Sequence, residues 1–243
     1  MTEGIRINKY LSEAGVCSRR AADRLIEEGR VLVDGVKALP GTKVSEENCV
    51  SVDGKEVKPS EKKIYLAFNK PRGIVVTSSD PKSQNVNIID YINYGERIFP
   101  VGRLDKDSSG LILLTNDGEL TNEILKARNF HEKEYEVTVN KAVTSSFIKG
   151  MSEGVPILDT VTRKCNVRKT GPRSFNIILT QGLNRQIRRM CEYFDYRVIE
   201  LRRIRIMNIK LGELPEGRYR MLTDAELREL KKGFSGNGNG RVH

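Results

Sequence analysis

The apolar positions near the start of the chain follow a helical period and then give way to short strand-like runs. A periodic apolar face over residues 7–14 predicts a helix that ends at Gly15, and Ser18 is a candidate N-cap for a second helix. Two apolar runs, 31–33 and 50–52, are each followed by Asp-Gly, a dipeptide that favours tight hairpin turns. The pattern predicts a small domain of two helices and short hairpins.

Beyond a polar, proline-containing linker at 58–63, the apolar pattern changes to that of a larger sheet. The run 111–115 is apolar on both alternating faces, which is typical of a central strand buried on both sides. The run 133–139 alternates strictly between apolar and polar residues. Further strands are predicted at 64–68, 74–77, 162–169, 174–180 and 204–211, the last with a bulge near residues 207–208.

Helices are also predicted within this larger region. Leu120 begins a helically spaced group, Asn184 is a candidate N-cap, and Thr223 with Glu226 forms a capping box. Helices and strands do not alternate as in parallel βαβ units, so the predicted fold class is α+β, with a mixed, mainly antiparallel sheet flanked by helices. The predicted domains are a small one at 1–60 and a larger one at 61–232, followed by a disordered tail at 233–243.

Composition points to an anionic partner. The 243 residues carry a formal net charge of +10, with a pI of about 9.5, which suits nucleic acid or a membrane surface. No apolar run approaches the ~20 residues of a membrane span, and no signal peptide is recognised at the start. The four cysteines are scattered without a C-x-x-C motif, so neither a metal site nor a disulfide frame is expected.

The stretch 102–110 holds a carboxylate between two cations. Asp105 lies between Arg103 and Lys106, with glycines at both ends of the stretch. A turn aspartate is the common interpretation beside glycine. The flanking cations, which a turn does not require, favour instead a fixed, ionised carboxylate that can act as a nucleophile. Asp107 is a rival, and no second carboxylate has the spacing of a glycosidase pair.

Arginines and one tyrosine extend the candidate site. Residues 181–190 form the richest arginine cluster, with Arg202, Arg203 and Arg205 downstream. The cluster is either a solvated face or a clamp for RNA phosphates. Tyr135 is either a core residue or an aromatic platform for a base removed from its stack.

Residues 5 to about 52 resemble an S4 domain, a small RNA-binding module named for a ribosomal protein. The likeness runs through both predicted helices and the first strand, from Ile7-Asn8-Lys9-Tyr10-Leu11 to Val31-Leu32-Val33-Asp34-Gly35. The cations on this segment are the expected RNA contacts: Lys9, Arg19, Arg20, Arg24 and Arg30.

The larger region is similar to a known enzyme family. Gly102-Arg103-Leu104-Asp105, followed by 110–118, resembles the signature of the RsuA family of bacterial ribosomal-RNA pseudouridine synthases. Residues 69–73, 133–135 and 182–190 match its other motifs in order. Within the family, the chain is most similar to a member that acts on large-subunit ribosomal RNA.

The resemblance implies that Asp105 is the nucleophile that isomerises a uridine to pseudouridine, with no cofactor and no metal. It implies that Arg188 forms a salt bridge with Asp105 and that Tyr135 stacks on the target base. The residues expected to line the RNA at this site are Arg103, Leu104, Lys106, Arg185, Gln186 and Ile187. The expected partner is large-subunit ribosomal RNA, with transfer RNA as a second substrate, for a monomer in the cytoplasm. A non-catalytic S4-bearing factor in ribosome assembly is the alternative.

Overall fold

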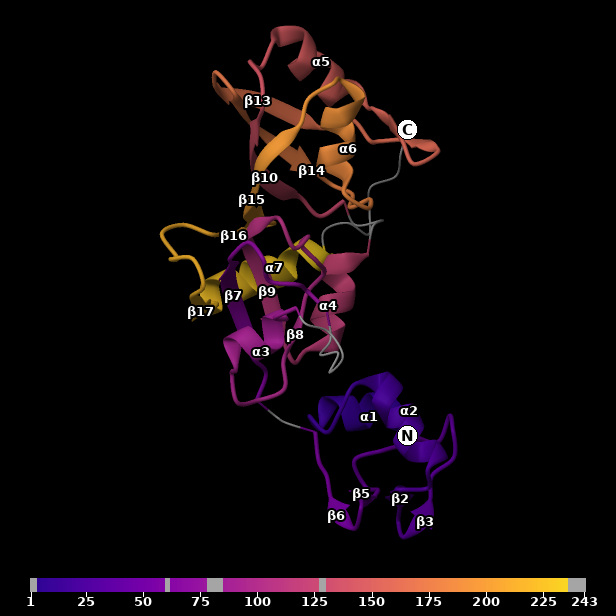
Figure 1. Ribbon diagram of the computed structural model, residues 1–243. Coiled ribbons are helices and arrows are strands. Elements are labelled where there is room, and N and C mark those ends of the chain that lie inside the picture. Colours follow the sequence, from indigo (N-terminus) through magenta and orange to yellow (C-terminus); the bar gives the residue numbers. More distant parts are fainter. Residues whose placement is uncertain (1–3, 60–61, 78–84, 127–129, 236–243) are drawn as a thin grey trace. The chain divides into compact units, whose positions relative to one another are not determined.

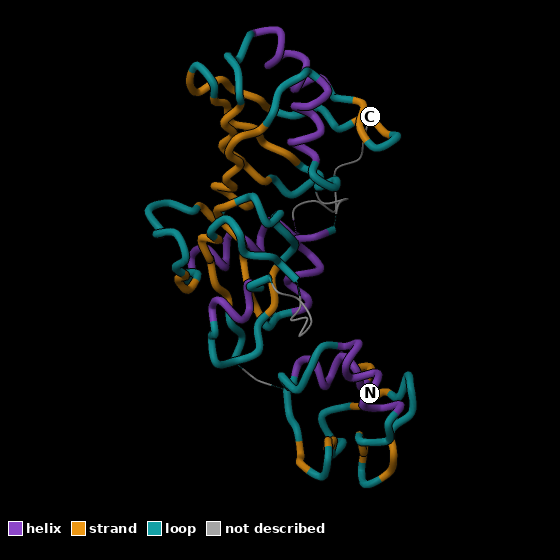
Figure 2. The backbone as a smooth tube through the Cα atoms, in the orientation of Figure 1, coloured by secondary structure: helices purple, strands orange, loops and turns teal. Residues whose placement is uncertain are grey.

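The computed structural model describes residues 4–59, 62–77, 85–126 and 130–235, which form two compact units (Figure 1). The smaller unit runs to Ile64 and also takes in Tyr94–Ile98 and Asn116–Gly118. The larger unit takes in the other described residues. The predicted α+β fold class is confirmed, because both units combine helices with largely antiparallel strands (Figure 2).

The smaller unit packs two helices against short strands around its own apolar core, which includes Leu11 and Ile26. The Ser18 hydroxyl accepts a hydrogen bond from the Ala21 N–H at 3.3 Å, so the predicted N-cap is confirmed. Both Asp-Gly pairs adopt positive φ angles in hairpin turns, as predicted. The elements are β1 (Ile5–Arg6), α1 (Ile7–Glu13), α2 (Arg19–Glu27), β2 (Val31–Val33), β3 (Val36–Lys37), β4 (Lys43–Val44), β5 (Val50–Val52) and β6 (Lys55–Glu56).

The larger unit is built on a mixed sheet whose strand order is β13-β14-β10-β15-β9-β7-β17. Strand β9 pairs in parallel with β15 and antiparallel with β7, and its apolar run is buried, as predicted for a central strand. The strands are β7 (Tyr65–Lys70), β8 (Phe99–Pro100), β9 (Ser109–Thr115), β10 (Lys133–Val139), β11 (Pro156–Ile157), β12 (Thr160–Val161), β13 (Asn166–Gly171), β14 (Ser174–Leu179), β15 (Val198–Ile206), β16 (Ile209–Lys210) and β17 (Tyr219–Met221).

Helices cover this sheet in two groups. Phe147 of α5 and Met190 of α6 pack with apolar residues of β10, β14 and β15. Ile124 of α4 and Leu230 of α7 pack with apolar residues of β7, β9 and β16. The helices are α3 (Ile88–Ile92), α4 (Gly118–Leu125), α5 (Ser145–Glu153), α6 (Gln186–Tyr193) and α7 (Asp224–Ser235).

Three local predictions were wrong. Residues 74–77 make only an isolated bridge between Val75 and Asn87. Segment 204–211 is a hairpin, because Met207 takes a positive φ and turns the chain so that β16 folds back on β15. Helix α7 extends to residue 235, into the predicted tail, while 236–243 lie outside the described residues.

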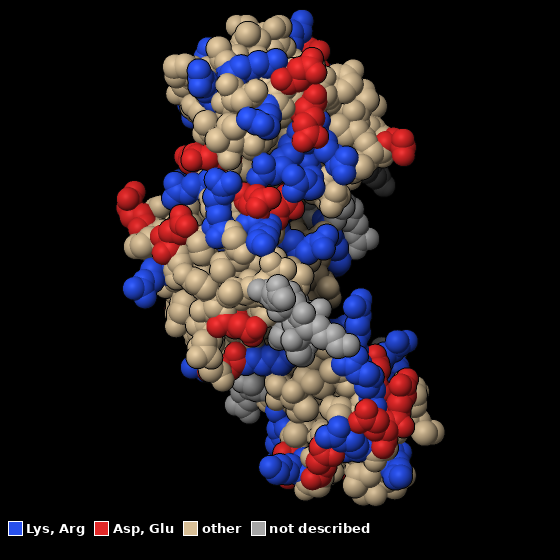
Figure 3. Space-filling model, viewed as in Figure 1, with Lys and Arg blue, Asp and Glu red and all other residues tan. Residues whose placement is uncertain are grey.

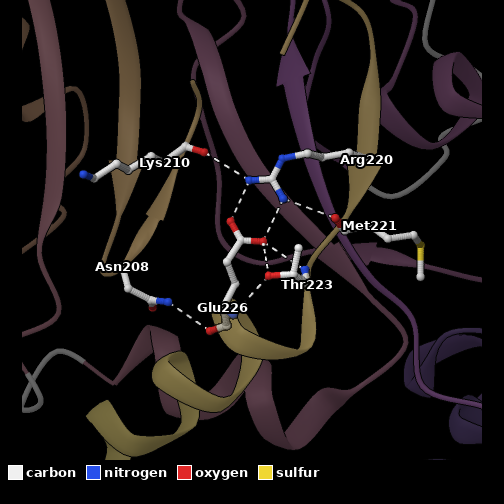
Figure 4. A network of polar contacts seen from close by, with 6 residues as sticks. All are labelled: Asn208, Lys210, Arg220, Met221, Thr223 and Glu226. Atoms are coloured by element: carbon white, nitrogen blue, oxygen red, sulfur yellow. Dashed lines mark hydrogen bonds and ion pairs between the residues drawn. The ribbon is translucent and has the colours of Figure 1, made fainter. Parts of the chain in front are cut away.

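The capping box of α7 is confirmed and is part of a larger polar network (Figure 4). The Glu226 N–H donates to the Thr223 hydroxyl at 3.2 Å, and the Thr223 N–H donates to Glu226 Oε2 at 2.9 Å. Arg220 of β17 donates to both oxygens of the Glu226 carboxylate, at 2.8 and 2.7 Å. These bonds link the last strand of the sheet to the last helix.

Replacing Glu226 by Gln is expected to lower the free energy of unfolding by about 1–2 kcal/mol at neutral pH, because Arg220 loses its charged partner while the cap can still form. The Arg220 guanidinium lowers the pKa of Glu226. Its stabilising contribution is therefore present above the unfolded pKa of about 4.3 and is lost as pH falls through the lower folded pKa. Urea unfolding between pH 3 and 7 measures the difference in free energy of unfolding between wild type and E226Q, and the exposed Glu229→Gln is the control. A difference that did not shrink at low pH would contradict the explanation based on the Glu226 charge.

Candidate active site

A cleft of about 700 Å³ opens in the larger unit. Asp105 is the one acidic residue among the described residues that line it. Lys and Arg side chains gather across the face of the larger unit drawn in Figure 3, around a small group of acidic side chains. A cleft of this size with cationic walls can hold an extruded nucleotide. The cationic lining residues are Arg103, Lys106, Lys126, Lys133, Arg185 and Arg203.

The turn that carries Asp105 is held by backbone hydrogen bonds. The Ser108 N–H donates to the Asp105 carbonyl at 3.1 Å, and the Gly73 N–H donates to the Lys106 carbonyl at 2.8 Å. The fully buried Lys70 ammonium donates to the Pro71 carbonyl at 2.7 Å and reaches the Lys106 carbonyl at 3.5 Å. Burial lowers the pKa of Lys70 to about 8, against the attraction of nearby acids. These contacts fix the Asp105 backbone at the wall of the cleft.

The strand behind this turn requires glycine at position 110. Gly110 pairs with Arg203 where β9 and β15 run parallel, and its φ angle is 101°. A Cβ atom added here would lie 2.3 Å from the Arg203 carbonyl oxygen. Any side chain at Gly110 would therefore separate the two strands that support Asp105.

Two arginines reach the Asp105 carboxylate. Arg185 Nη1 and Arg188 Nε lie 3.8 and 3.9 Å from Asp105 Oδ2. The Asp105 side chain is 35% exposed and that of Arg188 is 9% exposed. Arg188 Nη2 also contacts the Asp107 carbonyl at 3.3 Å and the Ser108 hydroxyl at 3.5 Å. Arg188 thus connects helix α6 to the Asp105 turn through these contacts.

The Nε of Arg188 is buried and has no hydrogen-bond partner, although it lies 3.9 Å from Asp105. Burial, and then the neighbouring Arg185, lower the pKa of Arg188. A movement of about 1 Å would bring this pair to hydrogen-bond distance. The arrangement places the Asp105 carboxylate at the cleft, with the buried Arg188 guanidinium beside it.

Helix α6 begins differently from the sequence prediction. Arg185 is the N-cap residue, in a left-handed conformation and with no side-chain cap, so the assignment of Asn184 as N-cap was wrong. The Gln186 side-chain oxygen instead accepts the Leu183 N–H at 3.0 Å. Asn184 accepts hydrogen bonds from Arg189. The Gln186 amide is therefore engaged by its own helix turn, although Gln186 also lines the cleft.

The aromatic and apolar candidates lie in the same cleft. Tyr135 of β10, Leu104 and Ile187 all line it, and Tyr135 also packs at the edge of the apolar core. Tyr135 stands opposite Arg203 of β15, whose guanidinium lies 6.0 Å from the ring centroid. Arg203 is 3% exposed, so this member of the arginine cluster is not part of a solvated face.

The cations predicted to bind RNA in the smaller unit are mostly exposed. Arg19, Arg20 and Arg24 are exposed on α2, whereas Lys9 pairs with Glu13 at 3.7 Å. Arg30 donates to both oxygens of Asp53, at 2.8 and 2.6 Å, and pairs with Glu28 at 3.0 Å. RNA would have to compete with two carboxylates for Arg30, so the α2 arginines are the better candidates.

Comparison with known proteins identifies the family. Residues 64–193, more than half of the chain, match the family model described as RNA pseudouridylate synthase.

The chain belongs to the RNA pseudouridine synthase family.

Residues 5–48 of this synthase match the S4 domain model. It is 54% identical over 236 residues to the dual-specificity RNA pseudouridine synthase RluF of Salmonella typhi, covering 96% of this chain and 81% of that one. It is 55% identical over 230 residues to RluF of Escherichia coli K12, covering 94% and 79%. A solved structure of a pseudouridylate synthase aligns over 93% of this chain and 99% of its own, with a TM-score of 0.68 and 27% identity.

The synthase is an isomerase that acts on RNA. The alternative of a non-catalytic S4-bearing factor is not favoured, because the catalytic family matches the larger unit directly. Among the described residues, no three His, Cys, Asp or Glu side chains cluster as a metal site. In the same part of the chain, every helix is too short or too polar to cross a membrane.

Proposed function

We propose that this synthase isomerises a uridine of large-subunit ribosomal RNA to pseudouridine, with Asp105 as the nucleophile and transfer RNA as a second substrate. The observation that carries the proposal is the position of Asp105 Oδ2, which lies within 4 Å of both Arg185 and Arg188 in a cleft large enough for a base. The high identity to synthases named as dual-specificity supports more than one RNA substrate.

The proposed reaction rearranges the target nucleotide without a cofactor. The bond between uracil N1 and ribose C1′ breaks, the base turns over in the cleft, and C5 forms the new bond to C1′. Asp105 attacks either C6 of the base or C1′ of the sugar. Arg188 aligns the carboxylate, while Tyr135 stacks on the base and Ile187 packs nearby.

In this proposal the exposed cations at the rim of the cleft bind the RNA backbone. Arg103, Lys106 and Arg185 are exposed cations beside Asp105 and suit backbone phosphates. Removing a base from its stack costs a few kcal/mol, which phosphate contacts offset. The exposed arginines of α2 would add contacts through the S4 domain. We further propose that the protein acts as a monomer in the cytoplasm, where ribosomal RNA is made.

The experiment that tests this function uses RNA transcripts of three kinds: large-subunit ribosomal RNA, transfer RNA and small-subunit ribosomal RNA. After incubation with the protein, carbodiimide adducts that resist alkali mark new pseudouridines. We expect modification of a single position in the large-subunit RNA and of transfer RNA, with none in the small-subunit RNA. Modification confined to small-subunit RNA would contradict the proposed substrate. No pseudouridine in any bound RNA would contradict the proposed activity.

A further inference from the structure

Lys133 and Arg203 are the less exposed cations of the cleft, here called its floor, and neither pairs with a carboxylate among the described residues. Lys133 opens β10 on the strand face that also carries Tyr135, and Arg203 stands opposite Tyr135 on β15. Both residues line the cleft, whose one acid among the described lining residues, Asp105, is paired with Arg185 and Arg188 instead. The floor therefore holds positive charge that the protein itself does not neutralise.

The hydrogen bonds of these two side chains leave donors free. The Lys133 ammonium donates to the His131 carbonyl at 3.3 Å, which occupies one of its three N–H groups. Burial, and then Arg203, lower the pKa of Lys133 to about 8, so it stays mostly protonated at neutral pH. Arg203 Nε donates to the Leu111 carbonyl at 2.7 Å, and Nη1 reaches the Arg103 carbonyl at 3.4 Å. Its Nη2 is buried without any partner.

The buried Arg203 Nη2 donor destabilises the fold unless a ligand satisfies it, and the half-buried Lys133 ammonium can also donate further hydrogen bonds to a ligand. The cleft offers two positions for the negative charge of RNA. The exposed cations at the rim, Arg103, Lys106 and Arg185, suit phosphates. The floor lies beside Tyr135 and the apolar Leu179 and Ile187, where a base and not a phosphate would fit.

We propose that Lys133, supported by Arg203, binds a carbonyl oxygen of the target uracil and stabilises the negative charge that the ring carries during the reaction. This inference rests on the proposed function. When the N1–C1′ bond breaks, its electron pair leaves with uracil and spreads over N1 and the two carbonyl oxygens. If Asp105 attacks C6 first, the charge forms an enolate on C5 and the C4 carbonyl oxygen.

The symmetry of uracil lets one fixed cation serve both halves of the reaction. A half-turn about the axis through C6 and N3 exchanges N1 with C5, and it also exchanges the two carbonyl groups. An ammonium that faces one carbonyl before the turn therefore faces the other carbonyl after it. The electron pair of the ring then forms the C5–C1′ bond, which makes the ring neutral, and the bond to Asp105 breaks. The C5 proton leaves and N1 takes up a proton, so the product ring is also neutral. Lys133 keeps its proton throughout and acts as a preorganised charge.

The test compares Lys133→Ala, Lys133→Gln and the control Lys149→Ala in the full-length protein. Lys149 is an exposed lysine of α5 that does not line the cleft. Single-turnover isomerisation, RNA affinity at fixed salt and thermal unfolding are measured for each. We expect K133A and K133Q to slow isomerisation by about 100-fold and to keep RNA affinity within about threefold of wild type, because the charge acts in the reaction and not in binding. K149A should keep its rate. Gln can still donate to the His131 carbonyl, so K133Q preserves the fold if K133A does not.

Chemical rescue separates a catalytic charge from a structural one. Methylammonium, added at constant ionic strength, should raise the K133A rate about tenfold or more and leave the K149A rate unchanged, because it restores a cation to the floor of the cleft. The inference is overturned if K133Q stays within about threefold of the wild-type rate, or if both variants lose RNA affinity as strongly as rate, which would indicate a phosphate contact. Failure of rescue in folded K133A overturns it as well. Pseudouridine formation by wild type in the same assay distinguishes these results from failure of the proposed function.

Discussion

Asp105→Asn is expected to abolish isomerisation, with a fall in the single-turnover rate of at least about 10⁴-fold, because the amide cannot act as a nucleophile. Binding of large-subunit RNA should stay within about threefold of wild type, since most of the affinity comes from phosphate contacts. The measurement is pseudouridine formed per RNA over time, with enzyme in excess and RNA occupancy determined separately.

Asp107→Asn is the matched control for this substitution. Asp107 has the same charge, lies two residues from Asp105 and is exposed, and its backbone carbonyl is the group that Arg188 contacts. D107N should therefore retain a rate close to that of wild type. Turnover by D105N, or an equal loss in D107N, would show that Asp105 is not the nucleophile.

Arg188→Met is expected to slow isomerisation by about 10²–10³-fold, because the cation that orients Asp105 is lost. Single-turnover rates measure the effect, and urea unfolding measures the accompanying loss of the Asp107 and Ser108 contacts. Arg189→Met is the control, because its side chain bonds to Asn184 within the same helix turn. R189M should keep most of the rate.

The coupling between Asp105 and Arg188 follows from a cycle of single and double substitutions. If Arg188 acts through Asp105, the double variant should be no slower than D105N alone. Independent, multiplying losses would mean that Arg188 serves a different step, such as contact with the RNA, and the pairing would be rejected.

Local signals predicted much of this architecture. The caps at Ser18 and Thr223 and the buried run of β9 were recognisable because each depends on residues adjacent in sequence. Predictions failed where distant parts of the chain decide the local structure. The unpaired stretch 74–77 and the Met207 turn both depend on which strands are available as neighbours.

The residues of the candidate site could likewise be predicted only where the signal is local in the sequence. The Asp105 turn was recognisable from its charges, but the distance to Arg188 depends on how α6 packs against β10, β14 and β15. The position of Lys133 beside Tyr135 could have been predicted from the sequence, since the two-residue period that places Tyr135 and Val137 on one face of the strand places Lys133 there too. The sequence could not predict that Arg203 faces the cleft, because the register shift between β10 and β15 changes which residues of the two strands stand opposite one another.

The most direct test of the central claim is the release of tritium from large-subunit RNA labelled at C5 of uridine. Isomerisation at a single uridine replaces one C5–H bond by the bond to C1′, so the wild-type protein should release one tritium per fully labelled RNA molecule. D105N, at equal RNA occupancy, should release none. Tritium retention by RNA that is fully bound to the wild-type protein would contradict the account, and release by D105N at the wild-type rate would contradict the role of Asp105.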